Sequence, residues 1–316
     1  MTETAAIATQ GLTKQFERQR AVNNVDLEVE TGTVYGLIGP NGAGKTTLMR
    51  MLAMAEEAST GEIYLFGDRL IRGESNAKLK QYLGYLPDDF PLYEDLTVWD
   101  YLDYFARLYF LKPPLRRQRL EEVLELVQLT SKRHSPIAQL SRGMKQRLSL
   151  ARTIIHSPLL LLLDEPVSGL DPLARMQFRE IIKVLQASGM TIFISSHVLS
   201  DLAELCTAIG IMELGCLVES TPLSTLYERR AGRQLQISVL DNLERLITEV
   251  KQSPWVKTWE SLPEQNSLKI QFVGDTQASA DLLRSLIESG LAVTEFHTTQ
   301  EDLEAIFLKL GHQQVS

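Results

Sequence analysis

Near the start of the chain, polar and apolar positions alternate with a period of two, which predicts β-strands across residues 5–38. The alternation is strict over 25–29, and a glycine turn then precedes the apolar run 34–38. A glycine-rich segment follows, and residues 46–55 have the spacing of a helix. We therefore expect a strand, a glycine-rich loop and a helix in that order.

Helical spacing returns over residues 98–127, where two adjacent prolines divide the region into two predicted helices. Two short apolar runs, 159–163 and 191–195, are typical of parallel strands that are buried on both faces. Between these runs the pattern predicts a helix over 173–187. Strand, helix and strand together predict a βαβ unit.

The pattern loosens over residues 212–232, and the arginine-rich segment 229–233 has the composition of a hinge. Beyond it, the predicted strands are 235–240, 256–261, 268–273 and 291–297, and the predicted helices are 242–252, 277–289 and 301–310. This βαββαβα order predicts a small α+β domain. We expect two domains, 1–228 and 233–316.

Composition narrows the possible functions of this chain. Of its 316 residues 44% are hydrophobic and 23% are charged, which is typical of a globular protein. The net charge of −8 argues against a general nucleic-acid binder, because phosphate neutralisation needs surplus Lys and Arg. We see no export signal, no apolar run long enough to cross a bilayer and two cysteines that we expect to be reduced, so we expect a cytoplasmic protein.

The glycine-rich segment matches the pattern G-x-x-x-x-G-K-[ST] between a strand and a helix. Its glycines let successive backbone N–H groups point at phosphates, and the helix N-terminus adds positive potential. Lys45 is expected to reach the β- and γ-phosphates and Thr46 to bind Mg²⁺. A glycine-rich turn with a chance lysine is the alternative. The predicted nucleotide-binding residues here are Gly39, Pro40, Asn41, Gly42, Ala43, Gly44, Lys45, Thr46 and Thr47.

Three further polar residues follow the two buried strands. Asp164 and Glu165 come directly after the first strand, and His197 follows the second by two residues. The carboxyl ends of parallel strands meet at one sheet edge, where ligands bind. We expect Asp164 to hold Mg²⁺, Glu165 to polarise an attacking water and His197 to donate to the γ-phosphate. Solvated acids at a strand end and an ordinary surface histidine are the alternatives.

Three other segments match a known pattern. Residues 140–147 read LSRGMKQR, residues 168–171 read SGLD, and Phe16 precedes the glycine-rich segment. The glycine-rich segment 39–46, which we call the P-loop, and the acidic pair Asp164 and Glu165 belong to the same pattern. Together these elements occur in an order across residues 5–225 that resembles the ATP-binding-cassette (ABC) ATPases. An N-capped amphipathic helix is the alternative for 140–147. The resemblance implies a P-loop NTPase fold, with a RecA-like core, an antiparallel β-subdomain and a helical subdomain. The helical subdomain carries residues 140–147, which we call the signature segment.

The resemblance also implies a head-to-tail dimer with ATP and Mg²⁺ bound between two chains, either two copies or this chain and a related ATPase. In such a dimer, Ser141 and Gly143 of one chain meet the γ-phosphate bound by Lys45 of the other. The resemblance also gives Asp171, in the segment 168–171 that resembles the family's D-loop, as a nucleotide-binding residue, and Phe16 as the ring that stacks on adenine. The sequence departs from the family pattern in two segments. Arg142 and Met144 replace a glycine and a glutamine, and Asp88 replaces a glutamine. Asp88 is either a metal ligand or a loop acid.

Two surface features and the tail indicate what this protein binds and which group of ATPases it resembles. By the resemblance, the aromatic-rich stretch 89–110 belongs to a groove that receives a helix of a membrane-spanning permease, although most of its rings are expected to be core. Lys112 and the arginines at 116, 117 and 119 form a basic patch, which is either a solvated helix face or a site for anionic lipid. The tail, including 298–307, resembles the accessory domain of drug- and antibiotic-exporter ATPases.

We therefore interpret the chain as the ATP-hydrolysing subunit of an ABC exporter, bound peripherally at the cytoplasmic face of the membrane. ATP-driven dimer closure would power a separate permease. A soluble ABC protein of DNA repair, chromosome architecture or the ribosome is less favoured, because the chain has one cassette and no coiled-coil insertion. A regulator without turnover is disfavoured by the presence of Glu165 and His197.

Overall fold

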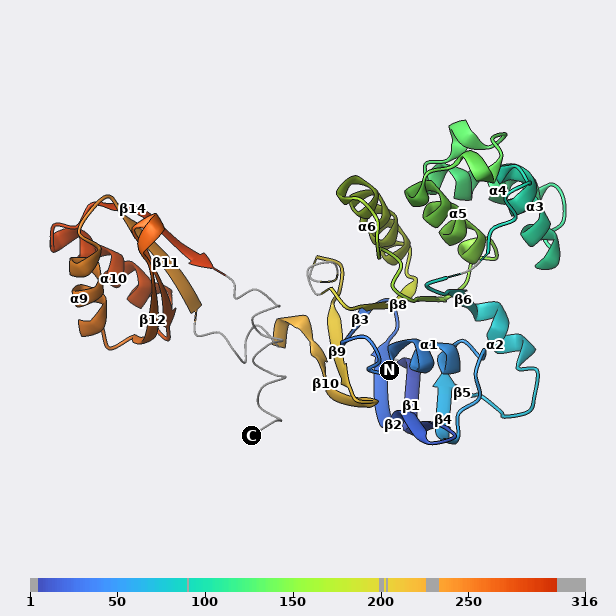
Figure 1. Cartoon of the computed structure of the whole chain (residues 1–316), viewed down its shortest axis with the longest axis horizontal. Helices are drawn as coiled ribbons and strands as arrows, with labels where there is room; N and C mark the ends of the chain where they lie inside the picture. Colours follow the sequence, from blue (N-terminus) through green and yellow to red (C-terminus); the bar gives the residue numbers. More distant parts are fainter. Residues whose placement is uncertain (1–4, 90, 199–201, 203, 226–232, 300–316) are drawn as a thin grey trace. The chain divides into compact units, whose positions relative to one another are not determined.

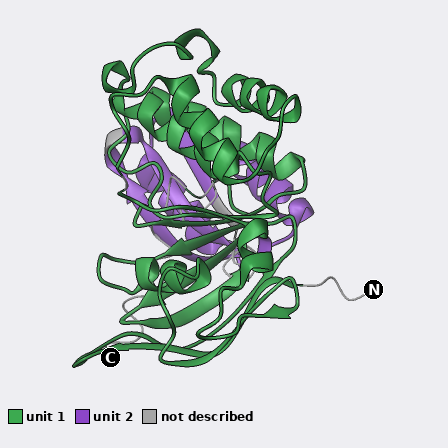
Figure 2. Cartoon of the chain, turned by 90° about the vertical axis from the view of Figure 1, so that its right-hand side faces the viewer, with its two compact units in different colours: residues 1–223 green, residues 224–316 purple. Residues whose placement is uncertain are grey.

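The computed structural model describes residues 5–89, 91–198, 202, 204–225 and 233–299. The chain forms two compact units, residues 1–223 and residues 224–316 (Figure 2). The predicted hinge, apart from its last residue, and the predicted helix 301–310 lie outside the described residues. Among the residues described, no helix has both the length and the apolarity needed to cross a membrane.

The first unit contains an antiparallel sheet in the strand order β2-β1-β4-β5 (Figure 1). Its strands are β1 (Ala5–Phe16), β2 (Gln19–Glu30), β4 (Thr60–Leu65) and β5 (Asp68–Arg69). In β2, Val25, Leu27 and Val29 are buried, and the acidic residues between them are exposed. The period-two prediction for 25–29 is confirmed, because the alternation separates a core face from a solvent face.

A second sheet of the same unit has the order β10-β9-β3-β8-β7-β6. Its strands are β3 (Val34–Ile38), β6 (Leu83–Leu86), β7 (Leu160–Leu163), β8 (Thr191–Ser196), β9 (Ala208–Glu213) and β10 (Cys216–Pro222). All neighbours pair in parallel except β9 and β10, and every residue of β3, β7 and β8 is buried. The carboxyl ends of β3, β6, β7 and β8 therefore share one edge.

The first unit also contains helices. They are α1 (Lys45–Leu52), α2 (Ala77–Tyr82), α3 (Val98–Leu108), α4 (Leu115–Leu126), α5 (Arg142–Ile154) and α6 (Pro172–Ala187), with 3₁₀ turns at Thr130–Lys132 and Ile137–Gln139. Helices α3, α4 and α5 pack on one another as a helical subdomain (Figure 1). The predicted division of 98–127 into two helices is confirmed. The hydrophobic pattern did not predict β4, β5, α2, β6, β9 or β10, and the loosened pattern over 212–232 begins inside β9 and contains β10.

The second unit has an antiparallel sheet in the order β12-β13-β11-β14. Its elements are β11 (Arg233–Val239), α9 (Leu243–Gln252), β12 (Val256–Leu262), a 3₁₀ turn (Pro263–Gln265), β13 (Ser267–Phe272), α10 (Thr276–Glu288) and β14 (Val293–Thr299). This strand order and the βαββαβ element order define a split βαβ, or ferredoxin-like, arrangement. Leu235, Ile237, Ile270 and Phe272 form its core with side chains of both helices. The predicted element order is thus confirmed as far as residue 299.

Candidate active site

The glycine-rich loop lies between β3 and α1, at the shared edge of the parallel strands. Gly44 has a φ of +102°, and a Cβ on it would lie 2.2 Å from the backbone oxygen of Ala21. A Cβ on Gly39 would lie 2.2 Å from the backbone oxygen of Met212. Side chains are therefore excluded at both ends of the loop. This tight backbone leaves α1 beginning at Lys45, with its first N–H groups next to the loop.

The ammonium of Lys45 lies within the loop. Its side chain is only 6% exposed, and Nζ donates to the backbone oxygens of Gly39 at 2.7 Å and Pro40 at 3.3 Å. It also lies 3.4 Å from Oε1 of Glu165, which forms an ion pair with it. Thr46, the next residue, is exposed. The loop thus combines a glycine backbone, a buried cation and an accessible hydroxyl, which are groups suited to a phosphate and its metal ion.

The carboxylate of Asp164 is fully buried after β7. Its Oδ1 accepts a hydrogen bond from Oγ of Ser195 at 2.6 Å, and the same Oγ accepts from the backbone N–H of Glu165 at 3.0 Å. Among the side chains that the structure describes, none forms a hydrogen bond with Oδ2 of Asp164, although this atom is buried. A buried carboxylate oxygen without a partner is costly unless a cation or water binds it, so Asp164 fits Mg²⁺. The sequence analysis missed Ser195, and its only signal was a polar residue at the end of an apolar strand.

Glu165 and His197 meet in front of the loop. Oε2 of Glu165 lies 2.7 Å from Nδ1 of His197 and 3.3 Å from the backbone nitrogen of His197, which donates to it. A carboxylate only accepts, so this contact assigns the ring proton to Nδ1. Glu165 has a φ of +48°, a conformation that non-glycine residues rarely adopt and that occurs often at functional sites. Its carboxylate therefore bridges Lys45 and His197.

Asp88 lies in the loop after β6, on the same sheet edge. Partial burial and the negative charges of Asp164 and Glu165 raise the pKa of this carboxyl above its ordinary value, and the positive charge of Arg142 opposes that rise. The backbone N–H of Asp164 donates to the backbone oxygen of Leu86 at 2.9 Å, so Asp88 and Asp164 both follow the paired ends of β6 and β7. The structure thus brings the candidate metal ligands Asp88 and Asp164 into one region.

The remaining predicted nucleotide-binding residues lie elsewhere. Ser141 is the N-cap of α5, and its Oγ accepts from the backbone N–H of Met144 at 3.3 Å. The buried Gly143 follows it, and Asp171 caps α6 by accepting from Ala174 N at 3.0 Å. Within the described part of the chain, no hydrogen bond joins these three residues to the P-loop.

Phe16 ends β1 with its ring 43% exposed. The ammonium of Lys14 lies 4.8 Å from the centre of that ring. The aromatic face is thus accessible and lies next to a positive charge. A ring exposed in this way can stack on a flat aromatic base.

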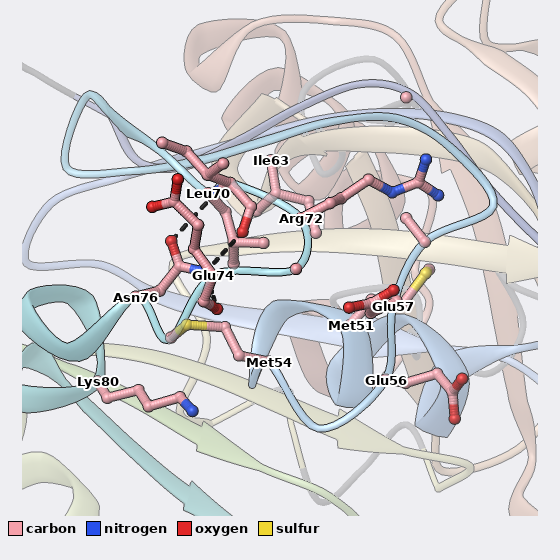
Figure 3. A pocket seen from close by; sticks show the side chains of 14 residues that line it. Met51, Met54, Glu56, Glu57, Ile63, Leu70, Arg72, Glu74, Asn76 and Lys80 are labelled. Atoms are coloured by element: carbon pink, nitrogen blue, oxygen red, sulfur yellow. Dashed lines mark hydrogen bonds between the residues drawn. The ribbon is translucent and has the colours of Figure 1, made fainter.

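A pocket that is partly open to solvent, with a volume of about 70 Å³, lies apart from this site (Figure 3). Met51, Met54 and Ile63 are among its lining residues, and the side chain of Asn76 ties the adjacent loop by accepting from Ile71 N and donating to Ile71 O. A space of this volume holds a few water molecules and is too small for a nucleotide. None of the residues that line it is a predicted nucleotide-binding residue.

The three arginines of the predicted basic patch pair with acids. Arg116 pairs with Asp103 at 2.7 Å. The two other arginines of the patch, 117 and 119, pair with Glu121 and Glu122 at 3.1 and 3.2 Å. Paired arginines on an exposed helix favour the solvated face over the lipid site among the two alternatives.

The chain is similar to several known proteins. A sequence profile described as ABC transporter matches residues 22–168. The bacitracin transport ATP-binding protein BcrA of Enterococcus faecalis is 33% identical over 96% of this chain and 96% of its own length. The linearmycin resistance ATP-binding protein LnrL of Bacillus subtilis is 28% identical over 96% of this chain and 97% of its own length. A solved ATP-binding subunit of an ABC transporter superimposes with a TM-score of 0.64 and 28% identity, covering 78% of this chain and 100% of that structure.

These similarities agree with the motifs and with the fold. The relative BcrA matches this chain almost end to end, which confirms the expected family. The solved ATP-binding subunit confirms the P-loop NTPase architecture. Nucleotide binding and ATP hydrolysis follow from membership of the family. The chain belongs to the ATP-binding subunits of ABC transporters.

Proposed function

We propose that this subunit hydrolyses ATP at the edge formed by β3, β7 and β8, with Glu165 as the general base. The observation that carries the proposal is the position of the Glu165 carboxylate, 3.4 Å from Lys45 Nζ and 2.7 Å from His197 Nδ1. Lys45 binds the phosphates, Glu165 accepts a proton from the attacking water, and His197 orients the terminal phosphate. The backbone N–H groups of the P-loop stabilise the phosphate charge.

The residues at this edge fit Mg²⁺. Asp164 offers a buried, unpartnered oxygen, Thr46 offers an exposed hydroxyl, and Asp88 lies near both acids of the site. When bound, the ion supplies positive charge to the phosphate oxygens. Ser195 holds Oδ1 of Asp164 and thereby leaves Oδ2 for the metal.

We further propose that two chains act together, either two copies or this chain and a related ATPase. Ser141 is exposed at the N-terminus of α5, and Gly143 and Asp171 lie at the starts of α5 and α6. Backbone N–H groups at a helix N-terminus attract phosphate, yet these groups do not bond to their own P-loop in the described structure. A nucleotide held by the partner chain would satisfy them, whereas Phe16 would stack on the adenine of the nucleotide held by its own P-loop.

The membrane-spanning partner is proposed to bind the helical subdomain. Of the aromatic residues there, Tyr101 is buried, whereas several apolar side chains are 41% to 86% exposed. They are Tyr93, Tyr104, Leu108, Tyr109 and Phe110, which we call the α3 patch. Large exposed apolar patches mark interaction sites in soluble domains. A permease contact there would hold this chain peripherally at the cytoplasmic face of the membrane, and the names of BcrA and LnrL favour export of an antibiotic or similar compound.

The residue roles are tested with Glu165→Gln and Lys45→Ala. Glu165→Gln should bind ATP but lose steady-state hydrolysis, and light scattering should show dimers in Mg·ATP. Lys45→Ala should lose ATP affinity, because the cation facing the phosphates is gone. Glu180→Gln and Lys183→Ala, which change exposed residues of α6, serve as controls. Full turnover in Glu165→Gln, or monomers under every nucleotide condition, would contradict the proposal.

The partner is tested by purifying the chain from native membranes. Recovery of a polytopic membrane protein supports the exporter. Recovery of ribosomes or DNA would instead support the soluble ABC class.

The second unit, as an accessory domain, should be dispensable for ATP binding by the first.

A further inference from the structure

Arg142, the first residue of α5, contacts the loop that precedes α6. Its Nη2 donates to the backbone oxygen of Ser168 at 3.0 Å, across 26 positions of sequence. The family pattern has a glycine at this position, which carries no side-chain donor. The contact is therefore a feature of this chain that the family pattern does not supply.

The guanidinium also packs closely against the loop. Gly169 has a φ of +65°, and a Cβ built on it would lie 2.5 to 2.7 Å from three guanidinium atoms of Arg142. On the other side of the same helix start, a Cβ on Gly143 would lie 2.7 Å from Cβ of Ala174 in α6. Two close contacts thus hold the start of α5 against residues 168–174. Each contact leaves no room for a Cβ, so the first requires a glycine at residue 169 and the second a glycine at residue 143.

The loop that Arg142 holds begins at the catalytic carboxylate. The backbone N–H of Ser168 donates to the backbone oxygen of Glu165 at 3.1 Å, which closes a turn over 165–168. Arg142 donates to the backbone carbonyl of the same residue, Ser168. Because Glu165 has a positive φ, the surrounding contacts must keep its backbone in this conformation. Arg142 supplies one such contact from outside the turn.

We propose that Arg142 is a positioning residue for ATP hydrolysis, which fixes the 165–168 turn and links it to the signature end of α5. The inference rests on the proposed role of Glu165. It assigns Arg142 no contact with nucleotide. In consequence, a movement of the α5 start is transmitted to the backbone that carries the general base.

The test compares three substitutions in the full-length chain. Arg142→Ala and Arg142→Met should each lower kcat for ATP hydrolysis about tenfold, since a small displacement of a catalytic group costs up to about a hundredfold. Met keeps the apolar length of the side chain but has neither the donor nor the charge, so equal losses in both variants exclude packing of the side-chain stem as the cause. Arg142→Lys, which retains a donor, should recover most of the rate. The KM for ATP should stay within about twofold in all three.

The matched control is Arg117→Ala, in which the removed arginine is 79% exposed on α4. This variant should hydrolyse ATP at the wild-type rate. A raised KM in Arg142→Ala would mean that the guanidinium touches nucleotide, and an unchanged kcat would mean that it positions nothing. Either result overturns the inference. If Glu165→Gln turned over normally, the proposed function itself would fail, so the two failures are distinguishable.

A double-mutant cycle with Gly169→Ala supplies an independent test. In the wild-type background the new methyl group collides with the guanidinium, and in Arg142→Ala it does not. The positive φ of residue 169 is present in both backgrounds and cancels. Gly169→Ala should therefore lower kcat severalfold more in the wild type than in Arg142→Ala. Equal fold-changes in the two backgrounds would overturn the contact.

Discussion

Oε2 of Glu165 lies 2.7 Å from Nδ1 of His197, so the candidate base and the candidate γ-phosphate donor form a hydrogen-bonded pair. The backbone nitrogen of His197 donates to the same oxygen at 3.3 Å. With its Nδ1 proton held by Glu165, the ring offers Nε2 to a substrate oxygen, and Nε2 donates to a phosphate oxygen only when the imidazole is doubly protonated. The pair thus fixes both the direction of the carboxylate and the tautomer of the imidazole.

We expect His197→Ala to lower kcat for ATP hydrolysis by about a hundredfold, because a proton donor and the partner of Glu165 are both removed. Nucleotide affinity should change little, since Lys45 and the P-loop remain. Steady-state kinetics and ATP titration measure the two quantities. The control is His134→Ala, which changes an exposed histidine outside the site. Equal losses in the two variants would assign the effect to something other than the Glu165 pair.

Ser195→Ala should destabilise the nucleotide-free protein by about 1–3 kcal/mol. The hydroxyl of Ser195 is fully buried, donates to Asp164 and accepts from Glu165 N, so its removal leaves two buried groups unsatisfied. Urea denaturation measures the change. Ser188→Ala, at the exposed end of α6, should stay within about 0.5 kcal/mol. A wild-type free energy of unfolding in Ser195→Ala would show that water replaces the hydroxyl.

The sequence predicted the parts of this site that local spacing determines. The P-loop pattern and the apolar strands 159–163 and 191–195 place Lys45, Glu165 and His197 at one sheet edge, and the structure brings these three side chains within contact distance. The residue roles themselves stay predictions.

What the sequence analysis missed depends on contacts between distant segments. Ser195 bonds to Asp164 across 31 positions, and Arg142 bonds to Ser168 across 26. Neither partner can be identified from periodicity, because that depends on neighbours along the chain. Strand β10 was missed for another reason. It is an edge strand of the sheet and is mostly half-buried, so its apolar pattern is weak.

Asp88→Asn should raise the melting temperature of the nucleotide-free, metal-free protein at neutral pH. Burial and the neighbouring acids raise the pKa of Asp88, so the folded state binds a proton more tightly than the unfolded state does. The stability of the wild type therefore falls as the pH rises from the ordinary carboxyl value of about 3.9 through the raised pKa. The difference between the two proteins should vanish below that window. Thermal melts across pH measure it.

The control for Asp88 is Asp95→Asn, which changes an exposed aspartate in the segment before α3. Its melting temperature should track that of the wild type at every pH. If Asp88→Asn also tracked the wild type, the carboxyl would be solvated and the proposed crowding of acids would be wrong. A lower melting temperature at neutral pH would reverse the sign and point to a stabilising partner for the charge.

Phe110 has two energetically unfavourable features, an exposed aromatic ring and a strained backbone conformation. Its ring is 86% exposed, and its φ of +59° is unfavourable for a bulky side chain. Asn adopts this backbone conformation more readily, so Phe110→Asn should leave the free energy of unfolding and the ATPase rate of the isolated subunit unchanged or slightly raised. In membranes that contain the permease, the same change should reduce the amount of subunit retained about tenfold, because an aromatic anchor of the α3 patch is lost. Val184→Asn, at a 55% exposed position of α6, is the matched control and should be retained fully. Full retention of Phe110→Asn would place the permease contact outside the α3 patch.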